Sequence, residues 1–312
     1  MGFNSIQFLV FFSVFFVIFW KINKVFEVNI SNAYLVCSSY LFYACWDYRF
    51  LSLILFSTIS DYMIGNKIYR SKNKRRRYFY LLISIFFNLG LLCVFKYFNF
   101  FIESFNVLFN SISIPTRFTT VNIILPIGIS FYTFQTLSYT IDIYRKKIEP
   151  ANNVIAFAAF VSFFPQLVAG PIERAKDFLG QFLVKKVWNY SEVKGGLRLV
   201  LWGFTKKIVI ADQVGILVNN IYALESSNGL MVLLGTFLFG IQIYTDFSAY
   251  SDIAIGLGRM LGFHLRKNFI TPYFSFSFQE FWSRWHISLS TWFRDYVYIS
   301  MGGCNSPVYN QT

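Results

Sequence analysis

Long apolar stretches recur along the whole chain, with short polar or basic segments between them. A helix needs about 20 predominantly apolar residues to cross the hydrocarbon core of a bilayer, and several of the stretches approach that length. The pattern therefore predicts an all-α fold, a polytopic bundle of transmembrane helices. The apolar stretches cover residues 6–20, 33–45, 50–59, 79–95, 98–109, 121–144, 151–170, 197–220 and 230–257.

The segment from Phe281 to Gly303 combines aromatic and polar residues at helical spacing. One face of a helix there would carry Trp282, Trp285, His286, Leu289, Trp292, Phe293 and Tyr296. The opposite face would carry Arg284, Ser288, Thr291 and Asp295. We expect one helix that ends at Gly302 and Gly303, with an ion pair between Glu280 and Arg284.

His286 is the candidate catalytic residue of this segment. Among aromatic rings the imidazole would be partly desolvated, and desolvation favours its neutral form, which can accept a proton. The alternative is a buried histidine that only hydrogen-bonds a backbone carbonyl. The pattern leaves both interpretations open.

Two other apolar stretches contain polar residues that are costly to expose to lipid. Residues 121–144 include Gln135 and Asp142, which indicates either a cavity lining or polar packing between helices. Residues 230–257 include Tyr244, Asp246 and Asp252. These carboxylates mark either a functional site or an ion pair, and we expect Arg259, Arg266 or Lys267 as the partner.

A further break is expected after residues 151–170, where Gly170 and Pro171 cannot continue a helix and Glu173 and Arg174 follow. Such a break at membrane depth is tolerated only when it is buried in protein or lines a cavity. The sequence therefore predicts a broken or re-entrant segment there.

Composition supports a membrane protein. Hydrophobic residues make up 55% of the chain, charged residues only 14%, and the formal net charge is +13. In a membrane protein this charge indicates basic cytoplasmic loops near anionic lipid rather than nucleic-acid binding. The densest basic runs are residues 70–77 and 145–147, which we expect on the same, cytoplasmic side, either as solvated loops or, for the first run, as a lipid site.

Metal chemistry has little support in the sequence. The four cysteines form no C-x-x-C pair, and the two histidines, His264 and His286, are too few for a zinc site. We expect neither a metal nor a bound cofactor.

Four blocks together resemble one family. They are LPIGISFY at 125–132, FFPQLVAGPIER at 163–174, YTDFSAYSD at 244–252 and FWSRWHISLS at 281–290. They are similar to the membrane-bound O-acyltransferase family, and within it to the bacterial alginate O-acetyltransferase branch. The teichoic acid D-alanine transfer proteins are a more distant likeness.

The resemblance implies helices around a central funnel, in one membrane domain over residues 1–312. It implies transfer of an acyl group, most simply acetyl, from a cytoplasmic thioester such as acetyl-coenzyme A toward an extracytoplasmic polysaccharide. The implied location is the inner (cytoplasmic) membrane, with a periplasmic or extracellular acetyltransferase and the polysaccharide as partners. His286 would be catalytic, and the supporting residues would be Trp285, Arg284, Ser288, Asp246, Tyr244, Gln135, Glu173 and Arg174.

The chain departs from the family pattern in one respect. The family carries a later histidine block, usually taken as the general base, which these residues do not contain. We therefore expect the N-terminal part of such an enzyme, inactive by itself. The alternatives are a membrane transporter or channel and a non-catalytic scaffold of an exopolysaccharide machine.

Overall fold

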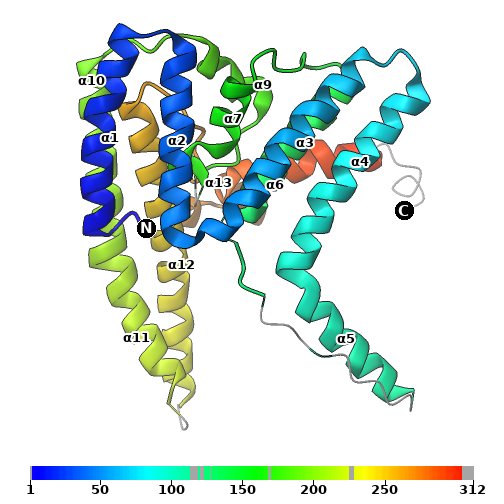
Figure 1. The fold of residues 1–312 in the computed structure, drawn as a ribbon. Helices are drawn as coiled ribbons and strands as arrows, with labels where there is room; N and C mark the ends of the chain where they lie inside the picture. The colour runs from blue at the N-terminus through cyan, green and yellow to red at the C-terminus, as the bar shows by residue number, and fades with distance from the viewer. Residues whose placement is uncertain are drawn as a thin grey trace.

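The computed structural model describes residues 2–112, 119, 123–126, 128–167, 170–224 and 228–303. Over these ranges the chain is helical and contains no β-strand, as the sequence predicts (Figure 1). The helices are α1 (Ile6–Val25), α2 (Val28–Asp47), α3 (Leu51–Arg70), α4 (Lys74–Leu92), α5 (Phe98–Ser111), α6 (Ile129–Tyr144), α7 (Val154–Ser162), α8 (Phe164–Leu167), α9 (Ala175–Phe178), α10 (Tyr190–Phe204), α11 (Asp212–Tyr222), α12 (Gly229–Met260), α13 (Phe278–Arg284) and α14 (Ile287–Phe293).

Within the described residues, three π-helical turns extend this set. The first, Cys93–Tyr97, joins α4 to α5, and the second, Thr205–Ala211, joins α10 to α11. The third, Arg294–Tyr298, follows α14 directly. Turns of this kind widen a helix locally and often lie at functional sites.

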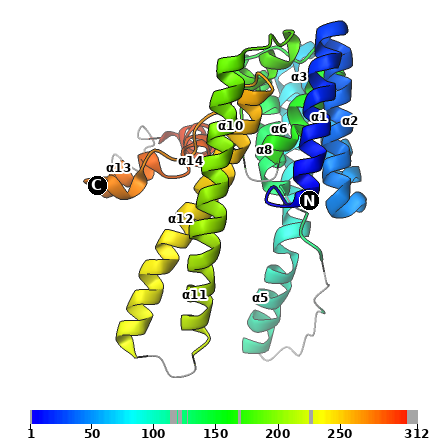
Figure 2. The same cartoon turned by 90° about the vertical axis from the view of Figure 1, so that its left-hand side faces the viewer.

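Helices long and apolar enough to cross a membrane are Ile6–Val25, Lys74–Ser111 and Gly229–Met260. In both views α5 and the hairpin of α11 and α12 extend from the same end of the helical body (Figures 1 and 2). None of the α5 side chains in the described structure is buried, and Phe100, Phe101 and Phe105 are exposed. Apolar side chains this exposed are suited to lipid rather than water, so the protein is a membrane protein.

Helix α6 lies at the centre of the body, packed between α3, α4 and α7. Its polar side chains are buried against protein. Gln135 donates to the carbonyl of Phe160 at 2.6 Å, and Thr136 donates to Asn88 of α4 at 3.0 Å. The polar residues of 121–144 that the structure describes therefore mostly join helices, and Gln135 bonds protein groups of α7 and α8.

A buried carboxylate anchors this packing. Asp61 of α3 accepts hydrogen bonds from Ser84 at 2.7 Å and Asn88 at 2.8 Å, both on α4. Ser84 is also 3.0 Å from Thr140 of α6. The polar groups of three helices thus satisfy one another away from lipid, which would leave them unpaired.

Helices α10 and α12 approach each other through glycine. A Cβ on Gly196 would lie 2.5 Å from the carbonyl oxygen of Gly256, and a Cβ on Gly256 would lie 2.7 Å from that of Gly196. No larger side chain fits at this crossing unless the helices separate, so small residues set the distance between them.

The charges of α12 pair with the π-helical turn beside it. Lys207 binds Asp246 at 2.7 Å, and Lys206 binds Asp252 at 2.7 Å. The expectation of Arg259, Arg266 or Lys267 as partners is wrong, because α12 turns these carboxylates toward the α10–α11 side. Arg259 pairs instead with Glu192.

The single helix expected over residues 281–303 is also wrong. The chain leaves the helical conformation between α13 and α14, where His286 takes a left-handed backbone with φ 41°. The backbone N–H of Ile287 donates to the carbonyl of Asn268 at 2.9 Å, and that of Ile270 donates to the carbonyl of Arg284 at 3.1 Å. These bonds to a distant segment replace the helical ones that the break removes.

We expect Gly196→Val to destabilise the protein by about 1–3 kcal/mol, since the added side chain must push α10 away from α12. Thermal unfolding in detergent, followed by the monodisperse fraction in size-exclusion chromatography, measures this. Gly90→Ala is the control, because a Cβ there meets nothing within 4 Å. It should be neutral or stabilising by up to about 1 kcal/mol. Equal losses for both variants would contradict the packing described.

Candidate functional site

His286 opens onto a cavity of about 360 Å³. The cavity lies between the start of α6, the π-helical turn after α4, and α14. Its wall is mostly apolar, and the polar side chains in it are those of Lys96, Tyr97, Ser130 and His286. The lining residues are Leu92, Lys96, Tyr97, Ser130, Phe131, Phe134, Ile172, His286, Leu289 and Phe293.

The His286 ring is enclosed by aromatic side chains. It meets Phe247 of α12 edge to face, with centroids 4.7 Å apart, and lies nearly parallel to Phe269 at 6.4 Å. Its Nε2 is buried and has no hydrogen-bond partner. Burial without a charge partner lowers the pKa of the imidazole to about 4, so the ring is neutral at physiological pH.

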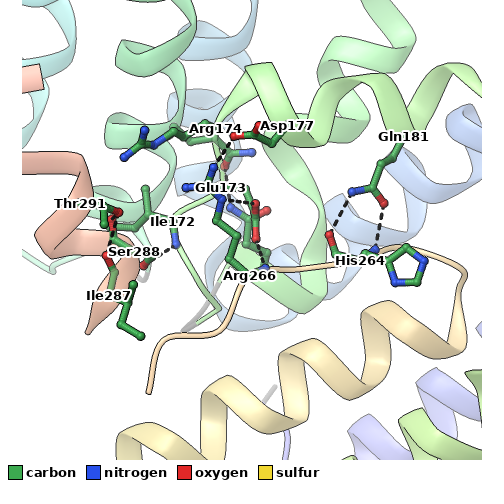
Figure 3. A network of polar contacts seen from close by, with 12 residues as sticks. Ile172, Glu173, Arg174, Asp177, Gln181, His264, Arg266, Ile287, Ser288 and Thr291 are labelled. Carbon is green, nitrogen blue, oxygen red and sulfur yellow. Dashed lines mark hydrogen bonds and ion pairs between the residues drawn. The ribbon is translucent and has the colours of Figure 1, made fainter. Parts of the chain in front are cut away.

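A buried hydrogen-bond chain fixes the backbone on both sides of this histidine. Ser288 donates to the Oδ1 of Asn268 at 2.6 Å, and the Nδ2 of Asn268 donates to Ser251 of α12 at 2.9 Å. The backbone N–H of Ile172 donates to the Ser288 hydroxyl at 3.0 Å, a contact visible in Figure 3. Three of the four sequence blocks therefore meet through Ser288 and Asn268.

Trp285 lies on the other side of the break, in an aromatic cluster. Its ring stacks on Phe281 with centroids 5.5 Å apart and contacts Phe269 at 5.1 Å. Tyr244 of α12 lies 6.1 Å from Trp285. The structure thus brings Trp285, Tyr244 and Ser288 together around the His286 backbone.

Glu173 and Arg174 follow the break at Gly170 and Pro171 and point into separate ion networks. Glu173 is 1% exposed and accepts the backbone N–H of Arg266 at 2.6 Å (Figure 3). Burial raises the pKa of its carboxyl to about 7. Arg174 binds Asp295 at 2.6 Å and lies over the ring of Tyr296.

The contacts of Glu173 and Arg174 hold in place the segment that contains Ile172. Ile172 in turn donates its backbone N–H to Ser288, next to His286. Arg266 also pairs with Asp177. The break that the sequence predicts after residues 151–170 is therefore present, and residues 170–173 are buried in protein.

Three expected site residues lie elsewhere. Asp246 pairs with Lys207 on the α10–α11 side of α12. Gln135 is enclosed by Phe160 and Gln166. Arg284 forms the ion pair with Glu280 that the sequence predicts, and this pair lies on α13.

Sequence reasoning missed Asn268, Lys96 and Tyr97. Asn268 is 1% exposed, yet it stands after two basic residues in a stretch with no periodic pattern, so nothing local marks it as buried. In the sequence, Lys96 and Tyr97 are typical of a helix end at the membrane interface. In the structure they belong to the π-helical turn and line the cavity. Among the residues that the structure describes, no group of three His, Cys, Asp or Glu side chains could hold a metal ion.

Comparison with known proteins gives consistent matches. Residues 145–311 match the family model described as MBOAT, membrane-bound O-acyltransferase family. A probable alginate O-acetylase of Pseudomonas putida is 42% identical over 283 residues, covering 89% of this chain and 57% of that protein. The corresponding protein of Pseudomonas aeruginosa is 44% identical, covering 87% of this chain and 52% of its own length.

A peptidoglycan O-acetyltransferase of Helicobacter pylori is 32% identical over 299 residues, covering 86% of this chain and 55% of that protein. The chain thus spans about half the length of the curated relatives it matches.

We expect the His286 imidazole to stay neutral from pH 8 down to pH 5, because protonation would place a charge among aromatic rings. ¹⁵N-histidine NMR of the detergent-solubilised protein measures the titration directly, and the His264→Ala variant assigns the two resonances. A His286 signal that titrates with a midpoint of about 6.5, the value of a solvated histidine, would contradict the desolvated site.

Proposed function

The chain belongs to the membrane-bound O-acyltransferase family, and from this we propose that it forms the His286-bearing part of an O-acyltransferase. The acyl group, most simply acetyl, passes from a cytoplasmic thioester toward an extracytoplasmic polysaccharide. Relatives named for alginate O-acetylation and peptidoglycan O-acetylation support the reaction class. The single structural observation behind the proposal is the unpartnered Nε2 of His286 beside a cavity.

The chemistry that His286 would supply follows from its neutral state. A sugar hydroxyl is a weak nucleophile, and a base that takes its proton during attack on a thioester carbonyl accelerates the reaction by about 10²–10⁴-fold. The new ester bond forms as the carbon–sulfur bond breaks and the thiol leaves. A neutral imidazole with a free ring nitrogen can either accept the hydroxyl proton or hydrogen-bond the reacting groups.

The other cavity residues suit the same reaction. Ser130 is a hydroxyl donor, and Lys96 is a cation at the wall of an otherwise apolar space. Either could stabilise the oxyanion of a tetrahedral intermediate, an effect worth up to about 4 kcal/mol per donor. Trp285, Ser288 and Tyr244 would hold His286 in place rather than touch substrate.

The direction of transfer follows from the charges. The basic runs at 70–77 and 145–147 both line one cavity, so they lie at the same end of the bundle. By the positive-inside rule this end is cytoplasmic, in the inner membrane of the cell. It would meet an acidic thioester donor such as acetyl-coenzyme A or an acyl carrier, while a periplasmic or extracellular acetyltransferase and a polysaccharide would take the product.

We expect His286→Ala to reduce acetyl ester content of the secreted polysaccharide by at least about 100-fold, the lower end of what a general acid or base contributes. The measurement is ester content in cells carrying the native gene with each substitution, at matched protein levels in the membrane.

His264→Ala is the control. His264 is exposed, and its backbone rather than its ring bonds Gln181, so the substitution should leave acetylation within about twofold of the native gene's level. Full acetylation by His286→Ala would overturn the proposed role. Transport of a solute with no ester formed by any variant would favour the transporter class instead.

A further inference from the structure

A second cavity, of about 600 Å³, lies between the two basic runs of the chain. It shares no lining residue with the His286 cavity. The turn between α3 and α4 forms one wall, and the end of α6 with the loop after it forms the other. The lining residues are Tyr69, Ser71, Lys72, Arg77, Ile143, Lys146, Lys147, Ile148 and Glu149.

Positive charge dominates this cavity. Four basic side chains line it against one carboxylate, Glu149, which accepts a hydrogen bond from Tyr69 at 3.2 Å. In the part of the chain that the structure describes, Lys72, Lys146 and Lys147 form no ion pair. Like charges held around one space repel one another unless an anion separates them.

Arg77 joins the two walls. Its Nη2 donates to the backbone carbonyl of Tyr144 at 2.6 Å, and its guanidinium lies over the Tyr144 ring at 5.4 Å. Its Nε is buried without a hydrogen-bond partner. A guanidinium held this way keeps the α3–α4 turn against α6, so the cavity is built by specific contacts rather than by a loose loop.

The α6 wall is shaped by an unusual residue. Helix α6 ends in a Schellman turn. In it, the backbone N–H of Lys147 donates to the backbone carbonyl of Asp142 at 2.8 Å, and that of Lys146 donates to the backbone carbonyl of Ile143 at 3.0 Å. Lys146 occupies the left-handed position, with φ 59°, where glycine is preferred. A lysine there presents its side chain at the cavity despite the backbone cost.

We propose that this cavity is a binding site for a phosphate group, carried either by an anionic lipid headgroup or by a soluble phosphate compound. Lysine ammonium groups bind phosphate oxygens as point charges, and guanidinium groups do so by charge-assisted hydrogen bonds. The site lies at the end of the bundle with the basic loops, where anionic lipid gathers. Ile143 and Ile148 give it an apolar side, which suits the hydrocarbon chains of a lipid.

The test uses the delipidated chain in neutral detergent at low ionic strength. Binding of dioctanoyl phosphatidylglycerol, dioctanoyl phosphatidylcholine and inorganic pyrophosphate is measured by native mass spectrometry and by thermal shift. The test variant is Lys72→Gln/Lys146→Gln/Lys147→Gln. The matched control is Lys74→Gln/Arg75→Gln/Arg76→Gln, which removes the same charge from the same region at residues that do not line the cavity.

We expect one saturable site for phosphatidylglycerol or pyrophosphate, weakened at least about tenfold in the test variant and within about twofold of native in the control. Tighter phosphatidylglycerol binding identifies a lipid headgroup as the source, and tighter pyrophosphate binding identifies a soluble phosphate. Equal weakening in both variants, equal affinity for phosphatidylcholine, or no saturable binding by either anion would overturn the proposal. If the triple variant elutes as aggregate, Lys72→Gln alone serves, since Lys72 lies outside any helix and is exposed.

Discussion

Backbone that leaves a helix inside a membrane bundle must find its hydrogen-bond partners within the protein, because lipid offers none. Asn268 meets this requirement where His286 separates α13 from α14. Its backbone carbonyl accepts from Ile287, and its side chain joins Ser288 and Ser251. Ser288 in turn accepts the N–H of Ile172, next to the Pro171 break. One buried amide therefore connects both interruptions to α12, and the orientation of His286 depends on it.

Each of the blocks that meet at this cavity contributes a departure from regular helix. Gly128 begins α6 with φ 76°, and a Cβ there would lie 2.2 Å from the carbonyl oxygen of Leu167, so only glycine allows α6 to start against α8. Gly170 and Pro171 end the apolar run before Glu173. His286 itself sits in the left-handed region. Strained or broken backbone at a shared cavity is typical of functional sites, where surrounding contacts hold it in place.

Much of this was open to prediction because it depends on local spacing or on bulk composition. Apolar run lengths determined an all-α membrane protein, and the four-residue spacing determined the Glu280–Arg284 ion pair. The basic runs were expected at one end of the bundle, and they share a cavity there. The desolvated state of His286 was also expected from its aromatic surroundings, although the rings that enclose it, Phe247 and Phe269, belong to other segments.

The tertiary structure determines which segments that are distant in sequence meet. The spacing of apolar and polar residues along the chain contains no information about this. Residues 281–303 fit one helix by pattern. The helix nevertheless breaks at His286, because the Asn268 carbonyl accepts the Ile287 N–H and the Ile270 N–H donates to the Arg284 carbonyl. Asp246 lies close in sequence to Arg259. It nevertheless forms its ion pair with Lys207, because it lies on the face of α12 that packs against the α10–α11 side. Nothing in the sequence around Asn268 indicates that it is buried, because its burial arises from elements far apart along the chain. Spacing along the chain reports neighbours within one helix, whereas the site is made by contacts between helices, which only packing sets.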